Sequence, residues 1–332
     1  YHLTKKIKVF FKPLNMFNNF ISSIDQKNKK YICCPNAITY NEVININKNN
    51  GKLIFKENKI NKLKSIKNPT EINGMKESHI RDGATLTRFI FWIKNNISKI
   101  HITELSASKK LDNLRSSNQN FFSLSFPTIA GSGPNGAIVH YRATKKSNRK
   151  IKDTDIFLLD SGAQYFDGTT DVTRTLAFKK VTKEQINMYT LVLKGHIAVA
   201  ISQFNKNEKG RLLDKRARQY LIKINKNFEH GTGHGVGSFL NVHEGPQSIS
   251  PRSMHKFEEG VIVSNEPGYY KKDSYGIRIE NLVLTKKIKN KYSFDTITMA
   301  PLEPMLIDAK LLTIKEKNWI NKYHSEVFCK IS

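Results

Sequence analysis

The sequence predicts an α+β fold in which helices cover one side of an antiparallel sheet. Apolar runs of strand length, separated by turn residues, occupy residues 121–178 and return over 260–284. Segments with apolar residues at helical spacing lie before, between and after these two groups of strands. This order of elements indicates the α+β class.

The expected helices are marked by their N-terminal signals and by apolar periodicity. Pro69 and Thr70 stand where a helix begins, ahead of apolar residues that recur at helical spacing. Thr182 and Gln185 form a capping-box pair in front of a second long periodic segment. The expected helices cover residues 69–93, 103–117, 182–204, 211–224 and 313–324.

The expected strands are short apolar runs bounded by turn residues. GSGPNG, residues 131–136, matches a dinucleotide-binding pattern, but a strand-like run comes after it where that motif requires a helix. We therefore interpret it as a turn between strands. The expected strands cover residues 6–11, 29–34, 51–55, 121–130, 136–144, 155–165, 169–178, 260–270 and 275–284.

Composition narrows the class of protein. The formal net charge of +27 over 332 residues is compatible with a nucleic-acid partner, but the lysines are spread along the whole chain without a recognition motif. A nucleic-acid partner is therefore not expected. No apolar run approaches the ~18 residues that a membrane span needs. Cys33, Cys34 and Cys329 fit neither a metal clip nor a disulfide framework, so reduced thiols are expected.

The run HGTGHGVGSFLNVHEGP, residues 230–246, raises the question of a metal site. His230 and His234 have the spacing of a zincin helix, but the glycines between and after them oppose a helix, and no glutamate follows His230. The zincin hypothesis therefore fails. The glycines instead indicate an extended segment with close backbone approach.

Four carboxylates beside apolar strands give the stronger signal. Asp160 ends one run, Asp171 follows an expected turn at 166–168, Glu266 follows another run, and Glu280 lies inside a fourth. A hairpin would direct the two aspartates into one space. Buried charges need partners, and divalent ions are the simplest shared partner for such a set. Oxygen donors with one imidazole suit manganese, cobalt or zinc, and do not suit a thiolate zinc site.

These residues resemble a known family. LLDSGAQYFDGTTDVTRT, HGTGHGVGSFLNVHEGP, NEPGYY and GIRIENL are similar, in the same order, to the metal-binding segments of the aminopeptidase P branch of the pita-bread metallopeptidases. GPNGAIVHYRAT and VLKGHIAVA resemble that branch as well. The resemblance implies a pita-bread catalytic domain at 63–292 and a C-terminal extension at 293–332. Residues 1–62 are then expected to end a creatinase-like middle domain, in a chain that lacks the first domain.

The resemblance also implies a site for two divalent ions, most often manganese, with cobalt or zinc as alternatives. Asp160 would bind one ion, Asp171 and Glu280 would bridge both, and His234 and Glu266 would complete the other. Such a pair of ions holds a shared water as the nucleophile. Glu266 would also accept a proton and pass it toward the leaving nitrogen.

The remaining histidines receive different roles. The resemblance places His140 and His243 against the substrate and makes His230 a further active-site residue. His196 is expected to pack or to support the site through a hydrogen bond. Arg278 is either a partner of a carboxylate ligand or a surface charge. His79, His101, His255 and His324 are expected to be structural or exposed.

The function implied is a cytoplasmic, homodimeric metalloaminopeptidase that cleaves the bond before a proline at position 2 of a peptide. A prolidase restricted to dipeptides and a methionine aminopeptidase are alternatives with the same fold. A metal-free pita-bread binding protein and a nucleic-acid-binding module are alternatives of other classes. The intact ligand positions favour the enzyme over the metal-free binder.

Overall fold

A computed structural model of the chain describes residues 13–23, 29–35 and 37–332. The chain divides into two compact units, Tyr1–Ile60 and Asn61–Ser332. Within the described residues, none of the helices combines the length and the hydropathy of a membrane span.

The first unit contains a parallel strand pair. β1 pairs with β2, and α2 connects them. Thr39 is the N-cap of α2 and forms a capping box with Glu42 in its first turn. The strands predicted at 29–34 and 51–55 are confirmed, and the strand predicted at 6–11 lies outside the described residues. The elements are η2 (Leu14–Met16), α1 (Phe17–Ser23), β1 (Lys30–Cys33), α2 (Tyr40–Lys48), β2 (Lys52–Phe55) and, crossing into the second unit, α3 (Lys59–Ser65).

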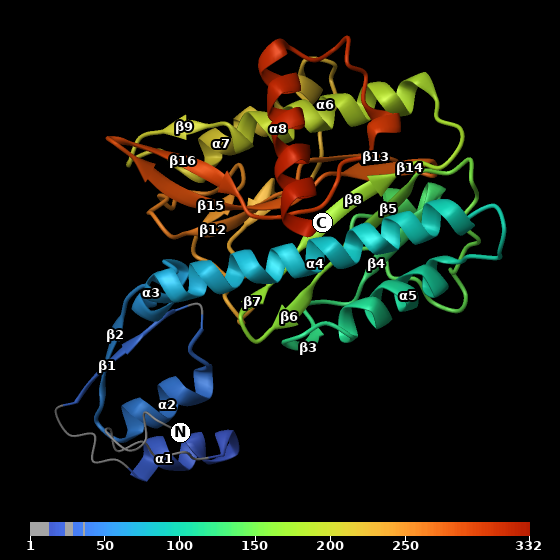
Figure 1. Cartoon of the computed structure of the whole chain (residues 1–332). Coiled ribbons are helices and arrows are strands. Elements are labelled where there is room, and N and C mark those ends of the chain that lie inside the picture. The colour runs from blue at the N-terminus through green and yellow to red at the C-terminus, as the bar shows by residue number, and fades with distance from the viewer. Residues whose placement is uncertain (1–12, 24–28, 36) are drawn as a thin grey trace. The chain divides into compact units, whose positions relative to one another are not determined.

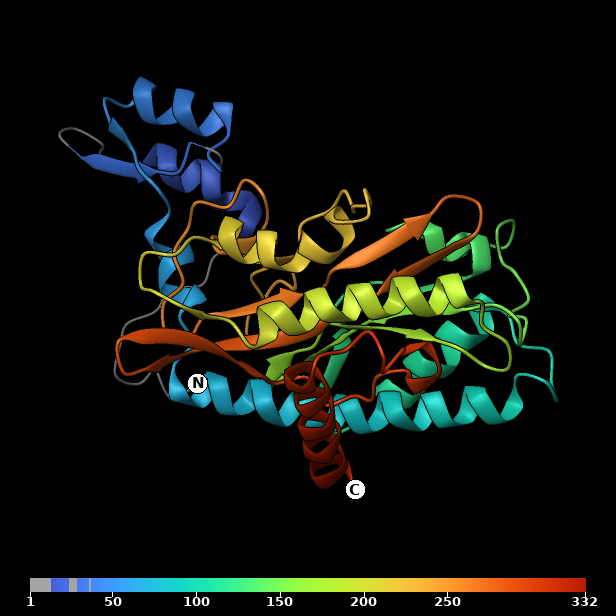
Figure 2. The same ribbon diagram turned by 90° about the horizontal axis from the view of Figure 1, so that it is seen from above.

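The helices of the second unit begin where the sequence places their caps. α4 starts at Pro69 behind a capping box formed by Asn68 and Glu71, and α6 starts behind the predicted box of Thr182 and Gln185. Figure 2 shows α4 and α6 running lengthwise along this unit. The helices are α4 (Pro69–Asn96), α5 (Glu104–Ser116), α6 (Lys183–Ala200), α7 (Gly210–Ile222) and α8 (Ile314–Ile331), with short 3₁₀ turns η3 (Gly133–Ala137) and η4 (Pro304–Leu306).

All strand pairs of the second unit are antiparallel, as predicted. The sheets have the orders β12-β15-β16-β9, β4-β5-β8, β3-β6-β7, β13-β14 and β10-β11. The strands are β3 (Phe121–Leu124), β4 (Ile129–Ser132), β5 (Phe157–Ser161), β6 (Ala163–Tyr165), β7 (Gly168–Thr169), β8 (Val172–Leu176), β9 (Gln203–Phe204), β10 (Gly233–His234), β11 (Ser248–Ile249), β12 (Ile262–Asn265), β13 (Gly268–Lys271), β14 (Tyr275–Arg278), β15 (Asn281–Ile288) and β16 (Lys291–Thr296).

Helices lie on both sides of the largest sheet, so the prediction of helices on one side is wrong. Side chains alternate along β15: Leu282 shares a core cluster with Met75 of α4, whereas Val283 shares one with Leu213 of α7. In Figure 1, α4 lies on one side of β12, β15 and β16, and α6 and α7 lie on the other. The run LVL at 282–284 is apolar on both faces, which is typical of a strand covered on both sides.

The strand predicted at 136–144 is also wrong. Residues 133–137 form the 3₁₀ turn η3, and the amide of Tyr141 donates to the carbonyl of Ile138 in a second turn. Pro134 sits at the start of η3, where its fixed φ and missing N–H are tolerated. The chain therefore satisfies its backbone groups locally, and the residues after η3 belong to a loop.

Two buried histidines predict how stability depends on pH. Burial lowers the pKa of His79 to about 4 and that of His196 to about 3. Between these values and ~6.5, the unfolded chain binds protons that the folded chain does not, so stability is lost as the pH falls through this window. The free energy of unfolding, measured with urea, should decrease between pH 6.5 and pH 4. We expect His79→Gln to make this decrease smaller by about 2 kcal/mol. The exposed control His101→Gln should leave the pH slope unchanged.

Candidate metal and active site

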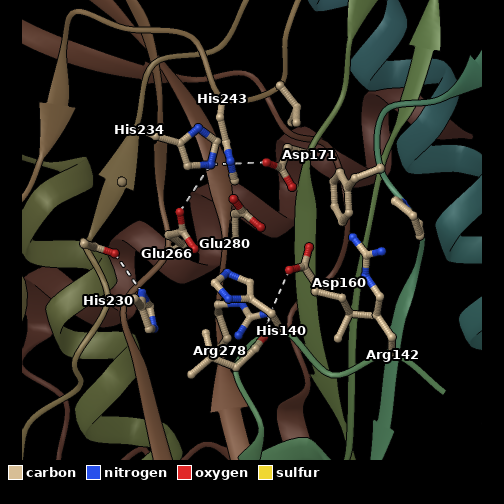
Figure 3. A pocket seen from close by; sticks show the side chains of 17 residues that line it. His140, Arg142, Asp160, Asp171, His230, His234, His243, Glu266, Arg278 and Glu280 are labelled. Atoms are coloured by element: carbon tan, nitrogen blue, oxygen red, sulfur yellow. Dashed lines mark hydrogen bonds and ion pairs between the residues drawn. The ribbon is translucent and has the colours of Figure 1, made fainter. Parts of the chain in front are cut away.

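A pocket of about 440 Å³ opens in the second unit and collects the residues singled out in the sequence. All five predicted ligands and the three predicted catalytic histidines line it (Figure 3). The lining residues are Phe126, Pro127, Ile129, Val139, His140, Arg142, Asp160, Asp171, His230, Gly231, Gly233, His234, Val242, His243, Glu266, Arg278 and Glu280.

Strand alternation explains why Asp160 points into the pocket. On β5, Phe157 and Leu159 belong to the core cluster beneath α4 and α5, so the residues between them face the opposite way. Leu158 packs on that opposite face with Tyr141. Asp160, two residues further along the strand, lies on the same face as Leu158. The apolar run that precedes Asp160 thus anchors the strand and aims the carboxylate.

The other carboxylates come from the ends of neighbouring strands. Asp171 directly precedes β8, which pairs with β5 so that Asp160 lies opposite Thr173. Glu266 follows β12 and Glu280 precedes β15, and these strands pair directly beside the two glutamates. The four carboxylates therefore lie at the ends of two antiparallel strand pairs, β5 with β8 and β12 with β15, and line the same pocket.

The possible ligand atoms of these residues form three overlapping groups, each within 4.8 Å. Asp160, Asp171 and Glu280 form one group, and His234, Glu266 and Glu280 form a second. Asp171 and His234 form a third with His243. Asp171, Glu280 and His234 each belong to two groups, and of these three only the carboxylates have two oxygens with which to bind two adjacent ions.

The tautomer of His234 suits a metal ligand. Its Nδ1 lies 3.0 Å from the carbonyl oxygen of Gly235, which only accepts, so Nδ1 carries the proton. The unprotonated Nε2 then lies 3.4 Å from Asp171 Oδ2 and 3.4 Å from Glu266 Oε1. A lone pair facing two carboxylates is repulsive unless a cation lies between them.

The pKa values of the carboxylates also indicate that negative charge in the pocket lacks a counter-charge. Burial, and then the negative charges of neighbouring carboxylates, raise the pKa values of Asp171 and Glu280 well above their ordinary range. Burial also raises the pKa of Glu266, but His234 and His230 in their protonated forms, Arg278, and the hydrogen bond from Ser264 outweigh it in the metal-free protein and leave that pKa lowered. Glu266 is therefore the carboxylate best suited to remain ionised.

The residues fit divalent ions. Asp160 Oδ1 is buried and has no hydrogen-bond partner among the described residues, although buried carboxylate oxygens are rarely left unpaired. Four carboxylates and one imidazole form a donor set for manganese, cobalt or zinc. Cations here would pair the orphaned oxygen, the His234 lone pair and the repelling carboxylates together.

A hydrogen-bonded chain holds Asp160 from behind. Arg278 Nη2 donates to Asp160 Oδ2 at 2.6 Å, and Nη1 donates to Tyr270 Oη at 2.6 Å. The Tyr270 hydroxyl in turn donates to His230 Nε2 at 2.8 Å, because His230 Nδ1 donates to the Gly231 carbonyl. Of the two roles considered for Arg278, the partner of a carboxylate is confirmed. Both ring nitrogens of His230 are engaged, which favours a positioning role.

The two predicted substrate-facing histidines are exposed at the pocket. The ring of His243 lies 4.1 Å from that of His234, centroid to centroid. Burial lowers the pKa of His243, and a proton on the neighbouring His234 would lower it further. His243 is therefore neutral at pH 7 and carries one ring N–H donor. His140 lies near Arg278 and Asp160 in Figure 3.

Glycines let the histidine segment pass close to other strands, as the sequence indicates. A Cβ on Gly233 would overlap the carbonyl of Ser264 on β12, and one on Gly235 would overlap the carbonyl of Glu244. β10 can therefore lie against β12, where the His234 amide donates to Ser264 Oγ at 2.9 Å. Ser264 Oγ donates in turn to Glu266 Oε1 at 3.0 Å and ties the two ligands together.

His196 supports the site from α6, one of the two roles expected for it. Its Nδ1 donates to the Asn265 carbonyl at 3.0 Å, and its Nε2 accepts from Asn281 Nδ2 at 3.2 Å. These asparagines precede Glu266 and follow Glu280, respectively. His196 therefore fixes the two strands at the point where they present both glutamates.

Sequence reasoning missed several residues of the site. Arg142 lines the pocket two positions after His140, and Phe126 forms part of its apolar wall. Thr173 donates to Glu280 Oε2 at 2.7 Å, and Tyr270 joins His230 to Arg278. Arg142 and Tyr270 lie inside segments that carry the family resemblance, and this was the one signal that could have found them.

Comparison with known proteins agrees with this geometry. The sequence profile of metallopeptidase family M24 matches residues 73–287, and the profile of the C-terminal region of peptidase M24 matches residues 290–332. A probable Xaa-Pro aminopeptidase P of Paracoccidioides brasiliensis is 48% identical over 286 residues, which are 82% of this chain and 46% of the relative. A probable Xaa-Pro aminopeptidase P of Botryotinia fuckeliana is 46% identical over 80% of this chain and 43% of the relative. The chain thus spans about half the length of these curated relatives.

Solved structures share the fold. An X-prolyl aminopeptidase from Caenorhabditis elegans, described as a cytosolic enzyme with a di-nuclear active site, superposes with a TM-score of 0.91 at 37% identity. The superposition covers 99% of this chain and 55% of that one. An Xaa-Pro dipeptidase from Bacillus anthracis superposes with a TM-score of 0.72 at 27% identity, over 83% of this chain and 74% of that one. The predicted pita-bread fold is confirmed.

Proposed function

The chain belongs to metallopeptidase family M24, and on this premise we propose that it is a dinuclear metalloaminopeptidase that removes the residue preceding a proline. The observation that carries the proposal is the cluster of four carboxylates and His234 around one pocket. The relatives named Xaa-Pro aminopeptidase P support the choice of substrate.

Asp160, Asp171, His234, Glu266 and Glu280 would hold two divalent ions, for which we propose manganese. When bound, such ions polarise the scissile carbonyl and lower the pKa of the attacking water. The protein supplies a fixed set of donors, because Arg278, Thr173, Ser264 and the Gly235 carbonyl each hold one ligand side chain in place.

Glu266 is the proposed proton acceptor. Its lowered pKa keeps the carboxylate ionised at neutral pH, so it can take a proton at Oε and return it to the leaving nitrogen. His243, as a neutral imidazole, can donate its ring N–H to the substrate carbonyl as negative charge develops there. His140 is proposed to contact the peptide from the loop after η3.

The apolar part of the pocket suits a proline ring. Phe126, Pro127, Ile129 and Val139 line it beside the ligand cluster. A proline on the leaving side presents no N–H to satisfy and a ring of fixed geometry. An apolar wall therefore accepts proline without leaving a donor unpaired.

A prolidase is the second candidate, because an Xaa-Pro dipeptidase shares the fold. The aminopeptidase is favoured by the higher TM-score and identity to the Caenorhabditis elegans X-prolyl aminopeptidase and by the relatives named Xaa-Pro aminopeptidase P. Cytoplasmic location is proposed from the neighbour described as cytosolic. The homodimer stays a prediction.

The proposal is tested by cleavage of matched peptides. We expect the manganese-loaded chain to release arginine from Arg-Pro-Pro and to act poorly on the dipeptide Arg-Pro, with a chelated sample as the control. Cleavage of the dipeptide alone would reassign the protein to the prolidases. Failure on both peptides, with no metal bound, would overturn the enzyme proposal and favour the metal-free binder.

A further inference from the structure

Arg142 is a cation at the pocket without a partner. It lines the cavity and is more than a third exposed, and within the described part of the chain it makes no hydrogen bond or ion pair. Arg278, the other arginine of the lining, is buried and committed to Asp160 and Tyr270. In Figure 3, Arg142 lies on the side of Asp160 that is remote from His230 and Glu266.

The backbone that carries Arg142 is held in place by a buried carboxylate. The neighbouring Tyr141 hydroxyl donates to Glu104 Oε2 at 2.8 Å, and Asn135 Nδ2 donates to Glu104 at 3.0 Å. The amides of Ser132 and Arg149 also donate to Glu104, at 2.8 and 2.9 Å. Glu104 thus joins both ends of the loop 132–149, so Arg142 extends from a fixed base.

Charge balance decides what Arg142 can bind. Two divalent ions would neutralise the four ligand carboxylates, and Asp160 also pairs with Arg278. Arg142 then remains as a positive charge with no internal counter-charge. The free α-ammonium of an aminopeptidase substrate would be repelled by this guanidinium, so the N-terminal residue must lie on the other side of the ions. Arg142 therefore faces the leaving side of the scissile bond.

The residues on the leaving side of the scissile bond indicate which substrate group Arg142 binds. Phe126 and Pro127, the apolar wall proposed for the proline ring, line the same pocket as Arg142. In a short peptide the C-terminal carboxylate lies close behind the proline, and an arginine guanidinium matches a carboxylate with two parallel N–H donors. We propose that Arg142 binds a carboxylate of the leaving peptide and so makes the enzyme selective for short peptides with a free C-terminus. This inference rests on the proposed aminopeptidase function.

Matched substrates test the inference. kcat/KM is measured for Ala-Pro-Ala as the free acid and as the C-terminal amide, with the manganese-loaded wild type, Arg142→Ala, Arg142→Lys and Lys145→Ala. Lys145 is an exposed cation of the same loop and controls for the general electrostatic field. We expect the acid-to-amide ratio to fall about tenfold in Arg142→Ala, mainly through KM, and to be partly restored by lysine. Lys145→Ala should keep the wild-type ratio.

Further measurements distinguish a C-terminal carboxylate from a side-chain carboxylate. They also distinguish failure of the Arg142 proposal from failure of the proposed aminopeptidase function. Ala-Pro-Asp amide against Ala-Pro-Asn amide tests a side-chain carboxylate, and a preference there that depends on Arg142 extends the inference to acidic residues. An acid-to-amide ratio that is equal in the wild type and Arg142→Ala, with peptides still cleaved, would overturn the inference and leave the proposed function intact. If no peptide is cleaved, the proposed function fails. Calorimetric affinities of Pro-Ala acid and Pro-Ala amide then decide whether Arg142 binds the carboxylate.

Discussion

Asp171→Asn is expected to lower kcat/KM at least about a thousandfold and, in the metal-free protein, to raise stability. Asp171 is shared between two groups of possible ligand atoms, so its loss disturbs both ion positions. Loss of ~4 kcal/mol of transition-state stabilisation corresponds to this factor. Without metal, burial and the charges of Asp160 and Glu266 oppose ionisation of this carboxylate, and asparagine removes that cost.

The sign of the stability change is set by the raised pKa values. The folded chain keeps protons on Asp171 and Glu280 at pH values where the unfolded chain has lost them. Stability of the metal-free protein therefore falls as the pH rises above ~4, and at pH 7 the asparagine variant avoids this loss. We expect a gain of about 1 to 3 kcal/mol in urea unfolding with chelator present.

A carboxylate of the same hairpin provides the control. Asp167 pairs with Arg81 at 2.6 Å outside the pocket, so Asp167→Asn should cost up to about 1 kcal/mol and leave kcat/KM near that of the wild type. A metal-free Asp171→Asn variant that is no more stable than the wild type would show that the cluster is not strained by charge.

His234→Ala and His243→Ala are expected to fail in different ways. His234 Nε2 points at two ligand carboxylates, so its loss should remove metal and activity together. His243 is exposed and neutral, and we assign it to the substrate carbonyl. His243→Ala should retain the metal and lose about a hundredfold to a thousandfold in kcat.

Metal content measured by elemental analysis separates the two roles. His243 shares a group of possible ligand atoms with Asp171 and His234, so a direct role in metal binding is the geometric alternative. Equal loss of metal from both variants would establish that alternative and end the assignment of His243 to the substrate. The exposed His255 offers a matched control, because His255→Ala should keep both metal and turnover.

Local signals in the sequence predict most of the fold. α6 begins behind the predicted box of Thr182 and Gln185, and α4 begins at the predicted Pro69, because the start of a helix depends on neighbouring residues. The run 136–144 fails as a strand because its apolar residues turn locally after Pro134 instead of pairing. The continuous apolar run at 282–284 is itself a signal that both faces of the large sheet are covered, but which helices cover them depends on contacts between distant segments.

In the candidate site, too, local sequence signals predict some features, and tertiary contacts decide the others. The positions of Asp160, Asp171, Glu266 and Glu280 beside strands already indicate a shared cation site. The partner of Arg278 could not be predicted, because Asp160 and Tyr270 reach it through tertiary contacts. Arg142 carries no local signal of its own, since its significance depends on the charges that surround it in space.

An anomalous-scattering crystal structure of the manganese-loaded chain tests the two-metal site most directly. We predict two peaks about 3.5–4 Å apart, with Asp171 and Glu280 touching both, Asp160 on one, and His234 and Glu266 on the other. Peaks elsewhere, or a single ion held by His243 without Glu280, would contradict this assignment.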